Sequence, residues 1–222
     1  MVGRKMLCSL RPGLILLMAL PCLYADTSSQ HSQLKEEEVY RFDQQHVVID
    51  DFEAEGYILA IGGGGEGIIG QIKGQQVIAI DINERELADA PPGPLKIVMD
   101  ARELKFLDQT FNTTAIFFTM MYIDGADHAK VLQEAHRVLA SGGRLLLWDA
   151  IFGPRPSPEK RIGVVPLVVK LPNREVETGY GVRWPSEPHD LDYYKRLGKD
   201  AGFELGESRV NGQWFFLELK KP

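Results

Sequence analysis

Short apolar runs alternate with amphipathic stretches along most of the chain after residue 56. Five runs are nearly continuous in apolar residues and predict strands buried on both faces: Tyr57–Ile61, Gln76–Ile80, Lys96–Met99, Thr113–Phe118 and Arg144–Trp148. Helix-type segments or turns lie between them, at Ile68–Lys73, Glu84–Ala88, Arg102–Phe106 and Ala129–Leu139. This alternation predicts an α/β fold, a doubly wound, mostly parallel sheet with helices on both faces.

The segment Ala129–Leu139 is the clearest helix of the pattern. Its apolar residues recur every three or four positions and form one face: Val131, Leu132, Ala135, Val138 and Leu139. Asp127 is the candidate N-cap, because a short acid before the first apolar turn can accept a backbone amide hydrogen. Ser141-Gly142-Gly143 is expected to end the helix, since glycine readily adopts the left-handed conformation.

The C-terminal part of the chain departs from the alternation. A helix over Leu191–Ala201 is followed by two β-type runs, Phe203–Val210 and Gln213–Leu219. Asn211-Gly212 separates the runs, and Asn-Gly is the strongest short signal for a β-hairpin. The sheet is therefore expected to end in a C-terminal antiparallel hairpin.

Residues 1–25 predict a signal peptide or a membrane anchor. Basic residues come first, the apolar run Leu14–Leu20 follows, and Ala25 is a small residue suited to a cleavage site. The run is shorter than the about 20 apolar residues of a spanning helix. These features predict a protein that is exported or held at a membrane through this segment alone.

Three other interpretations of the N-terminus stay open. Cys22 could carry a lipid, the segment could be a mitochondrial presequence, or a misassigned start could precede a cytoplasmic protein. The region 26–45 is expected to hold a polar leader and an N-terminal helix. The region 46–222 is expected to form one domain, within which 151–190 is an insertion.

Composition and charge narrow the classes of function. Hydrophobic residues make up 44% of the 222 positions and charged residues 25%, which is typical of a globular domain. The net charge is −6 and basic residues do not cluster with aromatic ones, so the chain lacks the pattern of a nucleic-acid binder. Both cysteines, Cys8 and Cys22, lie in the first 25 residues, which leaves the body without a thiol for a disulfide, a zinc site or a nucleophile.

A glycine-rich loop follows the first predicted strand. Ile58–Ile61 runs directly into Gly62–Gly67, which fits the pattern G-x-G-x-x-G between a strand and a helix. Without side chains the backbone can turn tightly, and a nucleotide-like ligand can lie against its amides near the next helix. A plain structural turn would use the same glycines.

Acids end the next two predicted strands. Asp81 lies 19 residues after Gly62, where a carboxylate can accept hydrogen bonds from a ribose diol. It could instead be a surface turn residue. Asp100 ends the third strand and can accept from an adenine amino group, or cap the following turn, or do both.

The stretch Ile58–Asp149 resembles the class I S-adenosylmethionine (SAM) dependent methyltransferases, a Rossmann-like group, and particularly their UbiE-type and type 11 branches. The resemblance is carried by the glycine loop, Asp81, Asp100-Ala101, Thr110-Phe111-Asn112 and the run Glu134–Arg144, in which Ser141 stands where proline is usual. It implies a transferase that uses SAM as its cofactor for methylation of a small-molecule acceptor. The oligomeric state is left open.

The resemblance also implies positions for the cofactor. The residues expected along its methionine and ribose part are Gly62, Gly63, Gly64 and Glu66. Asp81 would hold the ribose and Ile82 would pack on the adenine. Asp100 and Ala101 would read the adenine edge, with Phe117 and Phe118 lining the site.

One position departs from the family pattern. The family usually has an acid two residues before the first glycine, and this chain has Ala60. We hypothesise that Glu66 partly replaces that acid; unchanged SAM binding by Glu66→Ala would contradict it.

Methyl transfer from a sulfonium is an in-line displacement, so positioning in a dry site can supply much of the catalysis and no dedicated base is compulsory. Candidate catalytic residues are Asp149, Tyr122 and His128. Acids precede His128, but an acid before a helix is typical of a cap, so no metal site is predicted.

The segment Ile151–Asp190 is rich in proline and basic residues and contains β-type runs at Gly163–Leu171 and Glu175–Arg183. Insertions at this point lie above the strand ends, where ligands bind in open α/β sheets. We expect a lid or a substrate-recognition hairpin that suits an anionic acceptor. A solvated structural flap is the alternative.

Two other classes of function share parts of this pattern. An NAD(P)-dependent oxidoreductase would use the same glycine loop and Asp81, but Asp100-Ala101 and the closing hairpin do not favour it. A non-catalytic relative that binds SAM weakly or not at all is favoured by Ala60 and by the export-like leader.

Overall fold

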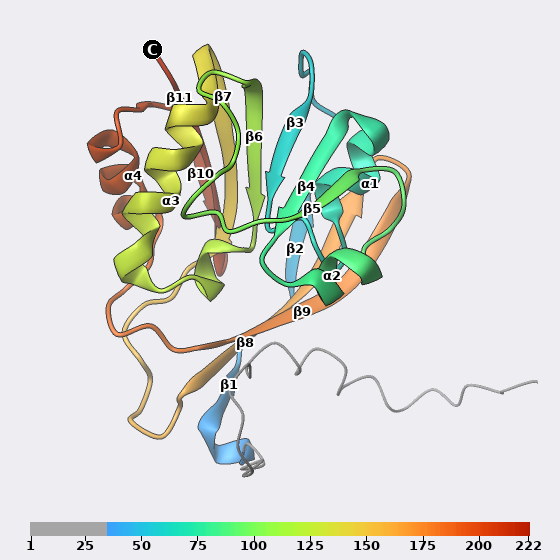
Figure 1. Ribbon diagram of the computed structural model, residues 1–222. Helices are drawn as coiled ribbons and strands as arrows, with labels where there is room; N and C mark the ends of the chain where they lie inside the picture. The colour runs from blue at the N-terminus through green and yellow to red at the C-terminus, as the bar shows by residue number, and fades with distance from the viewer. Residues whose placement is uncertain (1–34) are drawn as a thin grey trace, which may run out of the picture. The chain divides into compact units, whose positions relative to one another are not determined.

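The computed structural model describes residues 35–222, so the predicted signal or anchor segment, residues 1–25, lies outside the described residues. Seven strands form the central sheet, in the order β10-β11-β7-β6-β3-β4-β5 (Figure 1). Their bounds are β3 Ile58–Ile61, β4 Val77–Asp81, β5 Leu95–Val98, β6 Phe111–Phe117, β7 Leu139–Ala150, β10 Glu204–Asn211 and β11 Trp214–Lys220. Strands β3 to β7 are parallel, and β11 is antiparallel to both neighbours. The predicted mostly parallel sheet with a C-terminal antiparallel hairpin is confirmed.

The register of the three middle strands aligns their carboxyl ends. Ile61, the last residue of β3, lies beside Ile80 of β4 and Ile116 of β6. The residues that follow these strands therefore meet at one edge of the sheet, and this edge carries the candidate site.

One face of the sheet is covered by helices α3 (Gly125–Val138) and α4 (Leu191–Asp200), on the left in Figure 1. The apolar face predicted for α3 is fully buried against the sheet, through Val131, Leu132, Ala135 and Val138. Burial of a Val or Leu side chain contributes roughly 1.5–3 kcal/mol, so this contact is a main source of stability.

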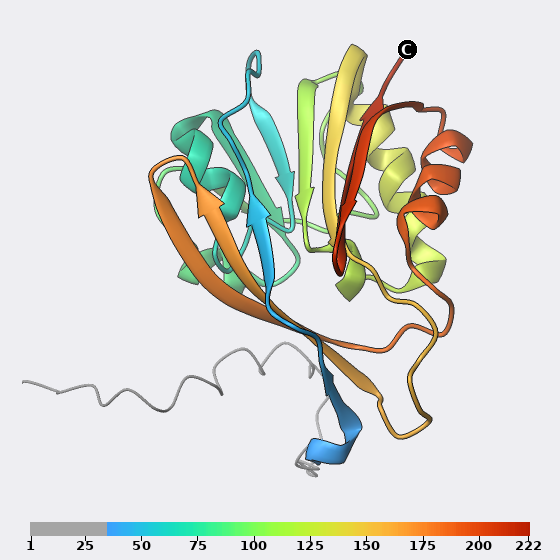
Figure 2. The same cartoon turned by 180° about the vertical axis from the view of Figure 1, so that it is seen from behind.

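The other face is covered by two short helices, α1 (Ile68–Lys73) and α2 (Glu84–Asp89), and by a second sheet. Helices thus cover both faces, as predicted. The second sheet consists of β1 Val39–Arg41, β2 Gln45–Val48, β8 Ile162–Leu171 and β9 Arg174–Arg183. β1 and β2 pair in parallel with successive parts of β8, and β9 pairs antiparallel with its whole length (Figure 2).

The predicted N-terminal helix is not found in the described part of region 26–45. Residues 36–38 form a 3-10 turn, η1 (Glu36–Glu38), and β1 and β2 follow. The reason is tertiary, because β8 belongs to the insertion and offers an edge that these residues complete. The insertion 151–190 lies outside the central sheet, as expected, and its two β-type runs are the hairpin β8–β9.

Two local predictions around α3 are wrong. The N-cap is Asp124, whose carboxylate accepts from the Ala126 amide at 3.0 Å, whereas Asp127 lies in the first turn and binds Arg102. Ser141-Gly142-Gly143 does not end the helix, which stops at Val138; it lies within β7 beside a register irregularity with β6.

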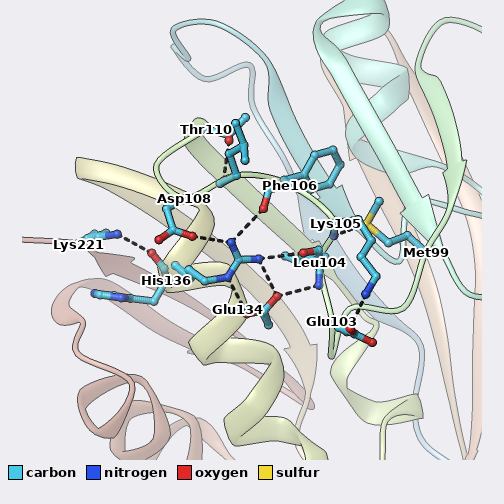
Figure 3. A network of polar contacts seen from close by, with 12 residues as sticks. Met99, Glu103, Leu104, Lys105, Phe106, Asp108, Thr110, Glu134, His136 and Lys221 are labelled. Carbon is cyan, nitrogen blue, oxygen red and sulfur yellow. Dashed lines mark hydrogen bonds and ion pairs between the residues drawn. The ribbon is translucent and has the colours of Figure 1, made fainter.

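The connection from β5 to β6 is fixed to α3 by a polar network (Figure 3). The Arg137 guanidinium donates to the carbonyls of Leu104 and Phe106 at 2.9 Å and to Asp108 at 2.7 Å. Glu134 accepts from the Leu104 amide at 2.7 Å and pairs with Arg137, which lowers the pKa of Glu134. This connection contains the predicted turn Arg102–Phe106 and forms no helix.

Short 3-10 turns complete the structure, at η2 (Gly74–Gln76) and η3 (Met120–Tyr122). Across residues 35–222, no helix combines the length and the apolar character needed to cross a membrane.

Candidate cofactor site

The glycine loop Gly62–Gly67 leaves β3 at the carboxyl edge and needs glycine for two reasons. Gly62, Gly65 and Gly67 have φ of +69°, +57° and +54°, a region that other residues rarely adopt. A Cβ on Gly62 would also lie 2.2 Å from the side chain of Thr119, and one on Gly64 would lie 2.6 Å from the Cβ of Glu86. The bare backbone therefore allows neighbouring elements of the chain itself to approach.

Several amides of the loop donate within the protein. Gly63 donates to the carbonyl of Ile80 at 2.9 Å, and Gly65 donates to the carbonyl of Glu86 at 2.9 Å. Gly67 donates to Gly64 at 3.0 Å. A ligand would therefore meet the loop mainly through the surface left by the missing side chains.

Asp81 and Ile82 form the part of the site that we call the outer half, together with Asp100 and Ala101. Asp81 Oδ1 accepts from the Asn83 amide at 2.9 Å, which orients the carboxylate toward the loop, and burial raises the pKa of Asp81. The Ile82 side chain is 65% exposed, although it is large and apolar. A planar apolar ligand group can cover it.

The Asp100 carboxylate already has a partner. Arg102 donates to it at 2.7 to 3.0 Å and bridges to Asp127 at 2.8 Å, and Oδ1 also accepts the Arg102 amide at 2.8 Å. This ion pair lowers the pKa of Asp100. Asp100 thus caps the turn that follows it. An amino group of a ligand would have to share the Asp100 carboxylate with Arg102. Ala101 beside it is half-buried.

The inner half consists of Gly62–Gly64 and Glu66, covered by β9. The Glu66 carboxylate accepts a hydrogen bond from the Thr178 hydroxyl and another, at 3.0 Å, from the Tyr180 hydroxyl. The space beneath this contact is a cavity of about 30 Å³, lined by the glycine loop, α1, Phe117 and Tyr180. Ligand pockets in proteins usually measure several hundred Å³, so this half is closed.

Ala60 lies in the floor of the same cavity. It is in register with Ala79 of β4 and Ala115 of β6, and all three line the space. The acid that the family usually has at this position would point into this cavity. No charge replaces it there, because the neighbouring side chains are methyl groups.

Glu86 is a third acid at the loop, and neither the glycine motif nor a strand end points to it. Its Oε2 lies 3.1 Å from a Cβ built on Gly65, and burial together with the charges of Asp81 and Glu66 raises the pKa of Glu86. Glu86 lies five residues after Asp81 on a predicted helix, and this position could have indicated that it lies near the loop. Three carboxylates thus surround the loop and favour a ligand with positive charge.

Phe117 ends β6 and Phe118 follows it directly. Phe118 has a φ of +47°, which is strained for a bulky side chain, and its amide donates to the Trp148 carbonyl at 2.8 Å. Its ring is 5.6 Å from the ring of Tyr180. Strained residues gather at functional sites, because the surrounding structure must hold them.

Asp149 is the last but one residue of β7 and is completely buried. Its oxygens accept from the amides of Ala150 at 2.8 Å and Met121 at 3.3 Å, and burial raises its pKa to about 7. Such a pKa suits a general base near neutral pH, but the carboxylate lies behind Met120–Tyr122 and holds that segment in place.

His128 is also fully buried, on α3. Its Nε2 lies 2.9 Å from the Met120 carbonyl, which can only accept, so Nε2 carries the hydrogen and Nδ1 accepts from the Tyr193 hydroxyl at 3.0 Å. Burial lowers the pKa of His128. Within residues 35–222, no group of three or more His, Cys, Asp or Glu side chains could hold a metal ion.

Tyr122 is the exposed candidate of the three, with 45% of its side chain open. Its ring lies 6.3 Å from that of Tyr180, at the border of the inner half. The structure therefore brings Tyr122 to the edge of the cofactor site and places Asp149 and His128 behind it.

Comparison with known protein families gives a match to the part of the chain that carries the glycine loop. Residues 59–147 match a family model described as a methyltransferase domain. A comparison with curated protein sequences gave no match.

Solved structures with the same fold include SAM-dependent methyltransferases. One from Methanosarcina mazei is 19% identical, with a TM-score of 0.54 over 77% of this chain and 94% of that chain. One from Mesorhizobium loti is 12% identical, with the same TM-score and coverage. A protein from Pyrococcus horikoshii is 19% identical, with a TM-score of 0.54 over 75% of this chain and 82% of that chain.

The predicted class I methyltransferase fold is confirmed, and residues 59–147 of this fold match the methyltransferase domain model. The UbiE-type branch stays a prediction.

Proposed function

We propose that this chain, with its methyltransferase domain at residues 59–147, transfers the methyl group of SAM to a small-molecule acceptor. The observation that carries the proposal is the meeting of the glycine loop, Asp81 and Asp100 at one edge of the sheet. Bound there, SAM would supply a sulfonium methyl group that a nucleophile can displace in line.

The residues fit the two ends of this cofactor differently. In the outer half, Asp81 would accept from the ribose hydroxyls, Ile82 would pack on the adenine and Asp100 with Ala101 would bind its edge. In the inner half, Glu66 is the loop acid closest to a positively charged end, supported by Glu86. The chain would thus hold the cofactor by charge at one end and by hydrogen bonds at the other.

The acceptor would lie where aromatic side chains border the inner half. Phe118, Tyr122 and Tyr180 surround this place and can exclude water and align an acceptor with the methyl group. A net charge of −6, with basic residues that do not cluster with aromatic ones along the sequence, supports a small molecule over a nucleic acid. Tyr122 is the candidate for contact with the acceptor, because it is the exposed one.

Calorimetry on the full chain with SAM, S-adenosylhomocysteine and NAD in turn tests the cofactor. Binding of the first two on the order of micromolar, and none of NAD, is the expected result. NAD binding alone would favour the oxidoreductase. Incubation with methyl-labelled SAM and a cell extract then tests the acceptor: label should appear in the fraction below ~1 kDa, a cut set by what a domain pocket can enclose.

A non-catalytic relative is the second candidate function. The closed inner half, in which Glu66 is bound by Thr178 and Tyr180, is the observation that favours it. If neither SAM, S-adenosylhomocysteine nor NAD binds in the same calorimetry, this candidate is supported.

For localisation we propose export or anchoring through residues 1–25, with the cytoplasm as the alternative. Fractionation of cells that express the full chain with a C-terminal tag would decide between them: tagged protein of full length in the cytosolic fraction would contradict export.

A further inference from the structure

The contact between Glu66 and β9 joins two parts of the chain that are 112 and 114 residues apart. Thr178 and Tyr180 are two positions apart on β9, so their side chains point to the same face of the strand. Each gives its hydroxyl hydrogen to one oxygen of the carboxylate. Burial and the Glu66 charge raise the pKa of Tyr180 well above its ordinary value, so the phenol stays a donor.

β9 is held to the rest of the molecule unevenly. Among the described strands it pairs with β8 alone, and its other edge has no strand partner. Val182 of β9 is buried in the hydrophobic core. At the carboxyl edge, β9 is fastened by the polar contact to Glu66 and by the ring contacts of Tyr180 with Phe118 and Tyr122.

Glycines flank Tyr180 in the strand. A Cβ on Gly179 or Gly181 would find no atom closer than 3.6 Å, so packing does not demand glycine at either position. Glycine inside a strand weakens it and leaves the backbone freer to bend. The segment that covers the inner half is thus also the segment of β9 best able to move.

We propose that residues 178–181 of β9 are a gate over the inner half, held shut by Glu66, and that SAM opens it by taking Glu66 from Thr178 and Tyr180. This inference rests on the proposed function. A cavity of about 30 Å³ cannot take the methionine end of the cofactor, whereas Ile82 in the outer half is already exposed. An ammonium group is a stronger donor to a carboxylate than two neutral hydroxyls, which makes the exchange favourable.

The gate predicts that its removal improves binding. The variant Thr178→Val with Tyr180→Phe keeps size and apolar packing but removes both donors to Glu66. The apparent affinity for SAM is the intrinsic affinity multiplied by the fraction of molecules whose gate is open. The double variant should raise this fraction, so SAM should bind about tenfold more tightly and associate about tenfold faster. The controls are Thr178→Ser, which keeps a hydroxyl, and Tyr57→Phe, at an exposed tyrosine just before β3.

Hydrogen exchange without ligand gives a second measurement. The amides of residues 176–182 should exchange several-fold faster in the double variant than in the wild type, while both controls match the wild type. Circular dichroism confirms that each variant is folded. Unchanged exchange in a folded double variant would overturn the gate.

The outcomes separate the gate from the proposed function. If the wild type binds SAM and the double variant binds no more tightly and no faster, the gate is wrong and the function stands. If neither binds SAM, the proposed function fails and the gate fails with it. Binding by the double variant alone would support both.

Glu66 itself can be tested once the gate is open. In the double variant, Glu66→Ala should weaken SAM binding about tenfold, because the carboxylate is then free for the ligand alone. Equal affinity with and without Glu66 would show that the exchange of partners does not occur.

Discussion

The outer and inner halves of the cofactor site end neighbouring strands of one sheet, yet they are in different states. In the outer half, Asp81 is oriented by a backbone amide and Ile82 is open. In the inner half, Glu66 is bound by β9 and little space remains. The difference shows that a strand end offers a site only as far as the elements above it allow.

The physical cause of the difference is the insertion between β7 and α4. It contributes β8 and β9, of which β9 covers the inner half, while Ile82 after β4 stays exposed. A ligand can therefore bind the outer half without rearrangement, and must exchange contacts to bind the inner half. The following changes would alter one half or the segment beside it, in order of expected effect.

The largest effect is expected at Asp149, which holds the wall of the inner half. Its pKa is raised to about 7 from 3.8, so the folded state binds the proton more tightly than the unfolded state. The protonated Asp149 therefore stabilises the folded state fully below pH ~4. This stabilisation, about 4 kcal/mol, is lost as the pH rises to ~7. Asp149→Asn should lack this dependence.

Urea unfolding at pH 4.5, 6 and 8 measures the effect. The free energy of unfolding of the wild type should fall relative to Asp149→Asn as the pH rises. Parallel curves for the two proteins would show that the carboxyl group is not protonated in the folded state.

Asp81→Ala should remove most of the contribution of the outer half. Two hydrogen bonds to a charged carboxylate are each worth about 1.5–3 kcal/mol, so SAM should bind at least roughly 100-fold more weakly in calorimetry. Asp89→Ala, at the exposed end of α2, is the control. A loss below about threefold would mean that Asp81 does not hold the ribose.

Ala60→Asp would place the acid of the family pattern under the inner half. SAM should bind about tenfold more tightly, since the new charge faces its ammonium group. Without ligand the variant should lose about 2 kcal/mol of unfolding free energy, because a carboxylate is buried among methyl groups.

Calorimetry and thermal unfolding check both parts of the Ala60 prediction. Ala79→Ser, in the same cavity but uncharged, should leave affinity unchanged. A folded Ala60→Asp protein with wild-type affinity would mean that the ligand does not reach this position.

The smallest effect is expected from Arg102→Ala, which frees Asp100 in the outer half. SAM should bind about threefold more tightly, because the adenine edge no longer competes with the guanidinium. Arg102 lowers the pKa of Asp100, so the stability of the pair is present above pH ~4 and is lost as the pH falls below it. Arg102→Ala should therefore lose less stability in acid than the control variant Arg85→Ala, which keeps the pair of Arg102 with Asp100. Equal acid unfolding of the two variants would contradict this.

Local sequence predicted the strands and most helices closely. α1 has the predicted bounds, and the hairpin at Asn211-Gly212 was found because its turn chemistry is local. The start of α3 was missed because Asp124 and Asp127 carry the same local signal. Arg102, far along the chain, binds Asp127 and leaves Asp124 to cap the helix.

The sequence alone determined where the outer half lies. Parallel strands bring their carboxyl ends to one edge, so a glycine loop and two acids at strand ends had to meet. Only the tertiary structure decided that Asp149 is buried, that Asp100 is paired and that Glu66 is covered by β9. Burial and contacts between distant segments depend on how the second sheet packs, and no local pattern encodes that.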